Sequence, residues 1–125
     1  MPLLSKSEIL KGEKQIETLY KSGKKISTGP LLIIKLETEK TDEPPVKAAF
    51  IVPKRNFRKA TERNRLRRQL REAWRLNKQP LIDVMKKNKK SLHLLLIYTG
   101  KTPVPFSEMQ QKIVLLLHRL MREHA

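Results

Sequence analysis

The sequence predicts one α+β domain in which a helix, two strands, a basic helix, a third strand and a final helix follow one another. The chain has 125 residues, the ordinary size of a single domain. Short apolar runs typical of strands alternate with segments whose apolar residues recur at helical spacing. Hydrophobic residues make up 38% of the chain and aromatics only 5%, so one small core of Leu, Ile and Val is expected.

The first helix is predicted over Glu13 to Lys21. Its apolar residues recur at helical spacing: Ile16, Leu19 and Tyr20. The pair Ser22-Gly23 that follows is a helix stop signal. We therefore expect one short helix ahead of the first strand.

Three short apolar runs are predicted strands. Leu31 to Leu36 is the first, and the polar, turn-forming segment Thr38 to Pro45 after it is predicted to be a loop. Val46 to Val52 is the second, and it ends at Pro53 because proline has no N–H to donate to a sheet. Leu92 to Tyr98 is the third.

A long basic helix is predicted over Ala60 to Asn77. Thr61 is predicted to cap its start, and Glu62 in the first turn suits the positive end of the helix dipole. Pro80 is expected to break this helix, and Leu81 to Lys87 to add a further helical turn or two.

The final helix is predicted over Ser107 to Arg122. The segment Ser107 to Gln110 has the spacing of a capping box. The apolar face of this helix is expected to consist of Met109, Ile113, Leu116, Leu117 and Leu120.

Arginine is concentrated in and just before the basic helix. Eight of the ten arginines lie between Arg55 and Arg75, and residues 54–75 carry +8 of the chain's formal net charge of +16. The planar guanidinium binds phosphate oxygens two at a time and stacks on bases, which the lysine ammonium cannot do. We infer that this segment binds nucleic acid.

The basic helix separates its packing side from its charged side. At 100° per residue, one arc of about 100° is apolar; it contains Leu66, Leu70, Ala73 and Trp74. A neighbouring arc of similar width is polar and basic; it contains Asn64, Arg67, Arg68, Arg71 and Arg75. Arg63 lies at the border and Arg65 points elsewhere, while Lys54, Arg55, Arg58 and Lys59 can extend the basic patch. A solvated charged face is the alternative, but such faces usually mix signs and use lysine.

The residues argue against an enzyme that works alone on nucleic acid. There is no cysteine, and His93, His118 and His124 lack the spacing of metal ligands. The twelve acidic residues are scattered, with no pair that suggests a two-metal site. No glycine-rich phosphate loop and no catalytic triad pattern appears. A basic nucleic-acid-binding module is favoured.

No targeting or membrane segment is expected. The N-terminus lacks the apolar stretch of a secretion signal, and the longest apolar runs are far shorter than the roughly 20 residues that cross a bilayer. We expect a soluble cytoplasmic protein, for which nucleic acid is the abundant polyanion partner.

One string within the basic segment resembles a family signature. Arg63-Asn64-Arg65-Leu66-Arg67-Arg68, preceded by Val52-Pro53-Lys54-Arg55 and Ala60-Thr61-Glu62, resembles the RNR motif of the bacterial ribonuclease P protein component. The resemblance extends over almost the whole chain in element order and length.

The resemblance implies a particular α+β fold. It adds a short strand over Lys24 to Ser27, so the order becomes α-β-β-β-α-β-α with a four-stranded mixed sheet packed against helices. It also implies a left-handed βαβ crossover through the basic helix, against the usual right-handed rule, as in domain 2 of ribosomal protein S5. The whole chain, residues 1–125, would be one RNA-binding domain.

The resemblance implies the protein subunit of ribonuclease P. In that family a large RNA cleaves precursor tRNA with Mg²⁺, and the protein docks on that RNA and holds the 5′ leader in a cleft between the first helix and the sheet. The expected partners are therefore the catalytic RNA and the leader, with no obligate protein partner, and Mg²⁺ bound mainly by the RNA and the substrate. No organic cofactor is implied.

Site residues follow from the matched positions. The resemblance implies that eight residues contact the catalytic RNA: Lys54, Arg55, Arg63, Asn64, Arg65, Arg67, Arg68 and Arg71. Arg58 and Arg75 join these predicted RNA-binding residues because they belong to the same basic patch. Tyr20, Ile16 and Ile34 occupy the leader cleft positions, where some family members carry aromatic residues. Tyr20 can stack on a leader base or form the rim of the core.

A different non-catalytic RNA-binding protein, such as a ribosomal protein, is the alternative function. Composition does not separate it from a ribonuclease P subunit, because both are small and basic. A preference for precursor tRNA with a leader over mature tRNA would separate them.

Overall fold

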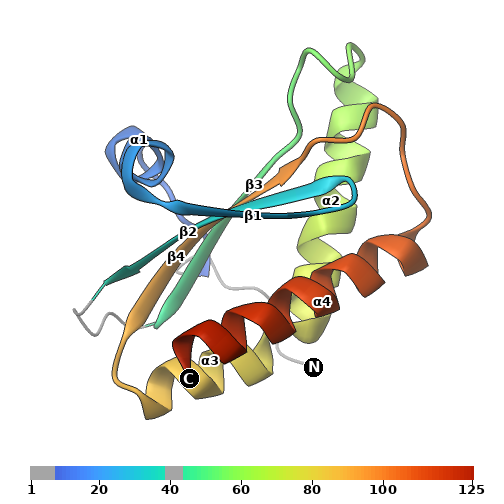
Figure 1. The fold of residues 1–125 in the computed structure, drawn as a ribbon. Helices are drawn as coiled ribbons and strands as arrows, with labels where there is room; N and C mark the ends of the chain where they lie inside the picture. The colour runs from blue at the N-terminus through green and yellow to red at the C-terminus, as the bar shows by residue number, and fades with distance from the viewer. Residues whose placement is uncertain (1–7, 39–43) are drawn as a thin grey trace.

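The computed structural model describes residues 8–38 and 44–125, and within these the chain forms four helices and four strands (Figure 1). The predicted loop Thr38 to Pro45 lies largely outside the described residues, which omit 39–43. The elements follow in the order α1, β1, β2, β3, α2, α3, β4, α4. The predicted α+β class is confirmed, with one complete helix more than the sequence predicted.

The four strands form one mixed sheet in the order β1-β2-β4-β3. They are β1 (Lys24–Thr28), β2 (Leu31–Thr38), β3 (Val46–Ile51) and β4 (Ser91–Tyr98). β1 and β4 pair antiparallel with β2, whereas β3 pairs parallel with β4. Because β3 and β4 run in the same direction, the chain between them must cross over, and the basic helix together with the helix that follows it forms most of that crossover.

The helices cover both faces of the sheet (Figure 1). They are α1 (Glu13–Ser22), α2 (Ala60–Asn77), α3 (Gln79–Lys87) and α4 (Phe106–His124). α1 lies on one face, and α2, α3 and α4 lie on the other (Figure 1). Within residues 8–38 and 44–125, no helix is long and apolar enough to cross a membrane.

Alternation along the strands creates two cores. Ile33 of β2 and Leu94 of β4 face the main core, which is completed by the buried stripe of α2 and by the apolar residues of α3 and α4. Ile34 and Leu95 point to the opposite face and form a smaller core beneath Leu19 of α1. The larger core therefore anchors α2, and the smaller core anchors α1.

The predicted apolar faces of α2 and α4 are confirmed. Every residue assigned to them is buried: Leu66, Leu70, Ala73 and Trp74 on α2, and Met109, Ile113, Leu116, Leu117 and Leu120 on α4. Since both faces follow from helical periodicity alone, the sequence was sufficient to identify them.

The two predicted side-chain caps are wrong. α2 begins at Ala60 with Lys59 as its N-cap, so Thr61 lies inside the first turn and makes no capping bond. α4 begins at Phe106 after Pro105, which likewise places Ser107 inside the helix. A side chain caps a helix only from the residue that precedes it.

The break predicted at Pro80 is instead a junction between two helices. α2 ends at Asn77, and α3 starts at Gln79 with Pro80 in its first turn. Proline is well tolerated there because the first N–H groups of a helix have no intrahelical partner. The buried ammonium of Lys78 forms an ion pair with Glu8 at this junction.

Candidate nucleic-acid interface

The loop between β3 and α2 carries the predicted basic pair, Lys54 and Arg55, in exposed positions. Its far end is anchored by Phe57, which is buried and whose ring lies 5.8 Å from the ring of Tyr98. Within the loop, the Asn56 N–H donates to the carbonyl of Pro53 across 3.2 Å. The loop is therefore held at defined points while its charged side chains face solvent.

Arg63, the first arginine of the Arg-Asn-Arg string, fastens this loop to α2. Its Nη1 donates to the carbonyl oxygens of Phe57, at 2.7 Å, and of Arg58, at 2.8 Å. Charged donors form stronger hydrogen bonds than neutral ones. The position of the basic pair relative to α2 thus depends on this side chain.

Two other arginines of α2 also have partners on their own helix. Arg67 donates to the side-chain oxygen of Asn64 at 2.9 Å, and Arg75 forms an ion pair with Glu72. The hydrogen bond from Arg75 lowers the pKa of the Glu72 carboxyl, and the same bond raises the pKa of Arg75. Glu72 therefore stays ionised next to the basic row.

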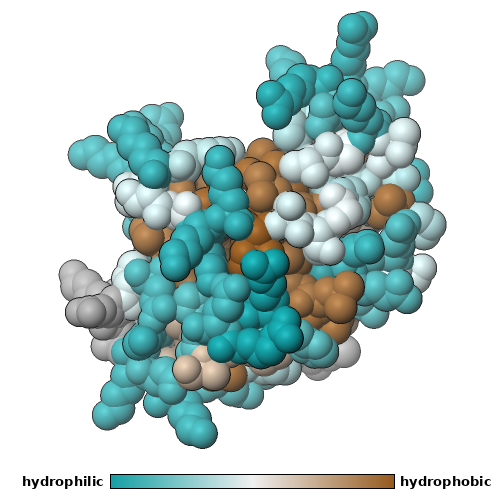
Figure 2. Space-filling view, viewed as in Figure 1, coloured by the Kyte–Doolittle hydropathy of each residue, from teal (hydrophilic) through white to brown (hydrophobic). Residues whose placement is uncertain are grey.

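The remaining arginines of α2 are unengaged. Arg65, Arg68 and Arg71 are exposed and make no hydrogen bond or ion pair within residues 8–38 and 44–125. Their guanidinium groups are free to bind an external anion. Hydrophilic side chains also gather over the start of α2 and the preceding loop, at the upper right of Figure 2.

A cleft of about 910 Å³ lies between α1 and the end of the sheet. We call it the α1 cleft; its lining consists of Tyr20, Leu32, Ile51, Pro53, Lys54, Arg55, Asn56, Ile97, Thr99 and Lys101. The walls combine apolar strand side chains with cations from the β3–α2 loop. An extended chain that carries both bases and phosphates fits this combination.

The three residues predicted for the cleft between the first helix and the sheet lie in different surroundings. Tyr20 is 48% exposed and lines the α1 cleft. Ile16 packs at the border of the smaller core, and Ile34 is 1% exposed inside it. The structure therefore brings only Tyr20 of the three to the wall of this cleft.

The sequence-based prediction did not identify several residues of the cleft wall. Leu32, Ile51 and Ile97 lie on the same face of the sheet as Ile34, and they line the cleft together with Tyr20 of α1. Strand alternation could have placed them on that face. No local signal shows how far a separate helix extends over it.

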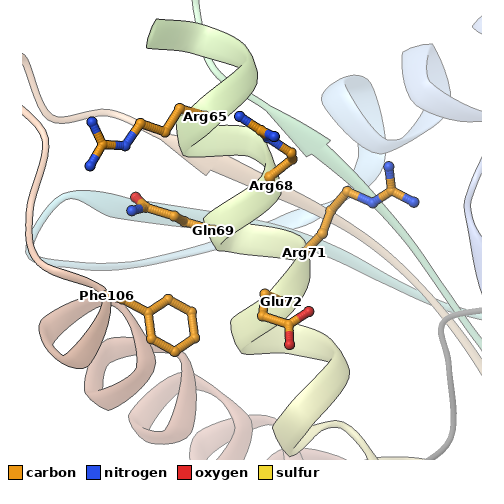
Figure 3. Close-up of a pocket in the computed structure, with 6 residues that line it drawn as sticks. All are labelled: Arg65, Arg68, Gln69, Arg71, Glu72 and Phe106. Carbon is orange, nitrogen blue, oxygen red and sulfur yellow. The ribbon is translucent and has the colours of Figure 1, made fainter.

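A second hollow lies between α2 and the start of α4. Arg65, Arg68, Gln69, Arg71, Glu72 and Phe106 line a cavity of about 570 Å³ (Figure 3). Arg65, Gln69 and Phe106 also line an adjoining hollow with the loop before α4. Because the two hollows share these three residues, we treat them as one depression, the Phe106 groove.

No metal centre is evident in residues 8–38 and 44–125, where the His, Asp and Glu side chains form no cluster of three suited to an ion. Glu72, an acidic residue beside the basic row, is already held by Arg75.

Sequence comparisons connect the chain to known proteins. The family model described as Ribonuclease P matches residues 4–121. A ribonuclease P protein component from Chlorobium phaeobacteroides is 33% identical over 127 residues, covering 94% of this chain and 87% of the relative. One from Porphyromonas gingivalis is 40% identical over 88 residues, covering 66% of this chain and 60% of the relative.

Solved structures agree with these matches. The ribonuclease P protein of Thermotoga maritima superposes with a TM-score of 0.69 at 25% identity, covering 90% of this chain and 96% of the other. The Staphylococcus aureus ribonuclease P protein, at 16% identity and a TM-score of 0.65, covers 93% and 99% and shares the fold. The chain belongs to the ribonuclease P protein component family.

Proposed function

We propose that this chain is the protein subunit of a ribonuclease P endoribonuclease. In this proposal it binds the catalytic RNA through α2 and the β3–α2 loop and holds the 5′ leader of precursor tRNA in the α1 cleft. Its role is to promote the Mg²⁺-dependent removal of that leader in tRNA 5′-end maturation. The chain itself carries no catalytic residue.

One observation supports the proposal most strongly. The basic pair Lys54 and Arg55 is exposed and lines the α1 cleft, and its loop leads directly into α2, which carries the free arginines Arg68 and Arg71. A single protein can therefore contact two RNA segments at once. Joining two binding events in one molecule raises the effective concentration of one RNA at the other.

The lining of the α1 cleft suits a single-stranded leader. Tyr20 offers one aromatic face for stacking, and Leu32, Ile51 and Ile97 supply an apolar floor. Lys54 and Arg55 supply positive charge at the rim, where a phosphate backbone would run. With one aromatic residue in the wall, recognition of the leader is expected to depend on shape and charge more than on base identity.

The chemical step is assigned to the RNA. Mg²⁺ is proposed to be held mainly by the catalytic RNA and the substrate. When bound there, the ion supplies charge stabilisation for phosphodiester cleavage. The basic side chains of this protein then act by neutralising phosphates and positioning the leader.

Cleavage of precursor tRNA by a bacterial ribonuclease P RNA at low Mg²⁺, with and without the protein, tests the proposal. We expect stimulation at near-stoichiometric protein, with the cut at the mature 5′ end. Precursor tRNA should also bind the complex more tightly than mature tRNA. RNA binding without stimulation, and without preference for the leader, would instead indicate a general RNA-binding protein such as a ribosomal protein.

A matched pair of charge reversals strengthens the test. Arg68→Glu with Arg71→Glu should abolish the stimulation, because both side chains are free and exposed on α2. Lys86→Glu with Lys87→Glu makes the same change in net charge on the exposed end of α3 and should leave most of the stimulation intact. Equal losses in both pairs would contradict the assignment of α2 as the RNA-binding element.

A further inference from the structure

The Phe106 groove is separate from the α1 cleft, and its side chains come from two elements. Arg65, Arg68 and Gln69 project from α2, and Phe106 projects from the first turn of α4 (Figure 3). The two lining sets have no residue in common. A ligand in the Phe106 groove would therefore not compete with a chain in the α1 cleft.

Phe106 presents an aromatic surface to this groove. The residue is only partly buried and packs against the main core, which holds the ring in place. Figure 3 shows the ring across the gap from Gln69 and Glu72, with its face visible. A ring that is fixed by packing loses little conformational entropy when a flat ligand stacks on it.

The polar side chains of the groove are available to a ligand. Arg65, Arg68 and Gln69 make no hydrogen bond or ion pair with other described residues. The Gln69 amide can donate and accept at once, as the edge of a nucleobase requires. The two arginines can bind the phosphates on either side of that base.

The charges around the groove favour an RNA occupant. An anionic backbone is attracted by the free guanidinium groups, whereas an apolar peptide would leave them without partners. Two carboxylates line the groove, Glu72 in the central hollow, which Arg75 already neutralises, and Glu62 in the adjoining hollow. The groove's own arginines outnumber them: Arg65, Arg68 and Arg71. RNA loops and bulges supply unstacked bases of the size that a cavity of about 570 Å³ can hold.

We propose that the Phe106 groove binds one unstacked nucleotide of structured RNA, with its base on the Phe106 ring and its edge against Gln69. This inference rests on the proposed function, since the RNA in question is the catalytic RNA. Besides neutralising phosphate charge, the protein would then make a contact that requires a base outside an RNA helix. The protein would then recognise a bulged or looped position and not only the phosphate backbone.

The test measures dissociation constants for a bacterial ribonuclease P RNA over a series of salt concentrations. The variants are Phe106→Leu, Phe106→Tyr, Gln69→Ala and, as a control, Leu115→Ala. Leucine keeps an apolar side chain against the core but removes the aromatic face, and tyrosine keeps that face. Leu115 is an exposed apolar residue of α4 that lines a different hollow.

Stacking predicts a distinctive pattern. Phe106→Leu should weaken binding about five- to a hundredfold at every salt concentration, with an unchanged salt slope because no charge is lost. Gln69→Ala should weaken it less. Phe106→Tyr, which keeps the aromatic face, should retain most of the affinity that Phe106→Leu loses, and Leu115→Ala should bind as the unmodified protein does. Thermal unfolding of each variant checks that the fold is retained.

Ultraviolet crosslinking supplies a second measurement that needs no substitution. A base stacked on the ring should give a peptide that carries one nucleotide at Phe106. Wild-type affinity in both Phe106→Leu and Gln69→Ala, with no crosslink at Phe106, would overturn the inference. If Arg68→Glu with Arg71→Glu still abolishes binding in that case, the proposed function stands without the base site. If the unmodified protein itself does not bind the RNA, both fail.

Discussion

Arginines that are neighbours in one sequence motif have different roles in the structure. Arg63 donates to two backbone carbonyls of the β3–α2 loop, whereas Arg65, two positions later, is exposed and has no partner among the described residues. The motif predicts RNA contacts for both. The contrast makes Arg63 a positioning residue for the loop and leaves its predicted RNA contact to experiment.

Substituting these two arginines separates the roles. Arg63→Ala should lower the free energy of unfolding by about 1–2 kcal/mol, because two loop carbonyls, one of them part-buried, lose a charged donor. Arg65→Ala, on the same helix, should change it by less than about 0.5 kcal/mol. Urea denaturation of both variants measures the difference. Equal stability in the two proteins would show that the Arg63 hydrogen bonds contribute nothing to the fold.

Trp74 is the largest side chain on the buried stripe of α2 and is only 2% exposed. Trp74→Ala should destabilise the domain by roughly 3–5 kcal/mol, because the cavity it leaves is too large to collapse fully. Leu115→Ala, at a position that is 56% exposed, should have little effect. The denaturation midpoints of the two variants give the comparison. A small loss of stability in Trp74→Ala would show that the core beneath α2 repacks.

At the scale of elements, the C-terminus of α4 is fastened to the sheet by charged groups. Lys35 of β2, only 6% exposed, pairs with Glu123, and the ring of His124 lies 2.6 Å from the carboxylate of Glu37. A hydrogen bond from Lys90 lowers the pKa of Glu37, and one from Lys35 lowers the pKa of Glu123. α4 is therefore attached by contacts that need ionised carboxylates.

These contacts should weaken in acid. A carboxyl group whose folded-state pKa lies below its unfolded value stabilises the fold fully above the unfolded pKa, and the stabilisation is lost as pH falls through the folded pKa. For Glu37 and Glu123 the loss should begin below the ordinary value of 4.5. In Lys35→Met the titration midpoint of Glu123, followed by carboxyl NMR, should move up toward that value. An unchanged midpoint would contradict the ion pair.

For the whole molecule, a net charge of +16 on 125 residues makes RNA binding strongly dependent on salt. With about six to eight phosphate contacts, the log–log plot of affinity against salt should have a slope of roughly −4 to −7 by counterion release. Arg68→Ala should reduce that slope by about one. A slope near zero in the unmodified protein would exclude the proposed RNA interface.

The sequence by itself determined the types of six elements (α1, β2, β3, α2, β4 and α4), the buried stripe of α2 and its basic side. Helical and strand periodicity, and the composition of residues 54–75, are local properties that can be read without a structure. Five of the predicted RNA-binding arginines are indeed exposed: Arg55, Arg58, Arg65, Arg68 and Arg71. Whether they contact RNA stays a prediction.

Only the tertiary structure decided which residues meet. It buried Ile34 under α1, placed Leu32, Ile51 and Ile97 in the wall of the cleft, and brought Phe106 beside Arg65 and Gln69. Each of these outcomes depends on contacts between segments far apart in the chain. The extent to which one element covers another is set by the packing of the whole core, and no local pattern of residues encodes it.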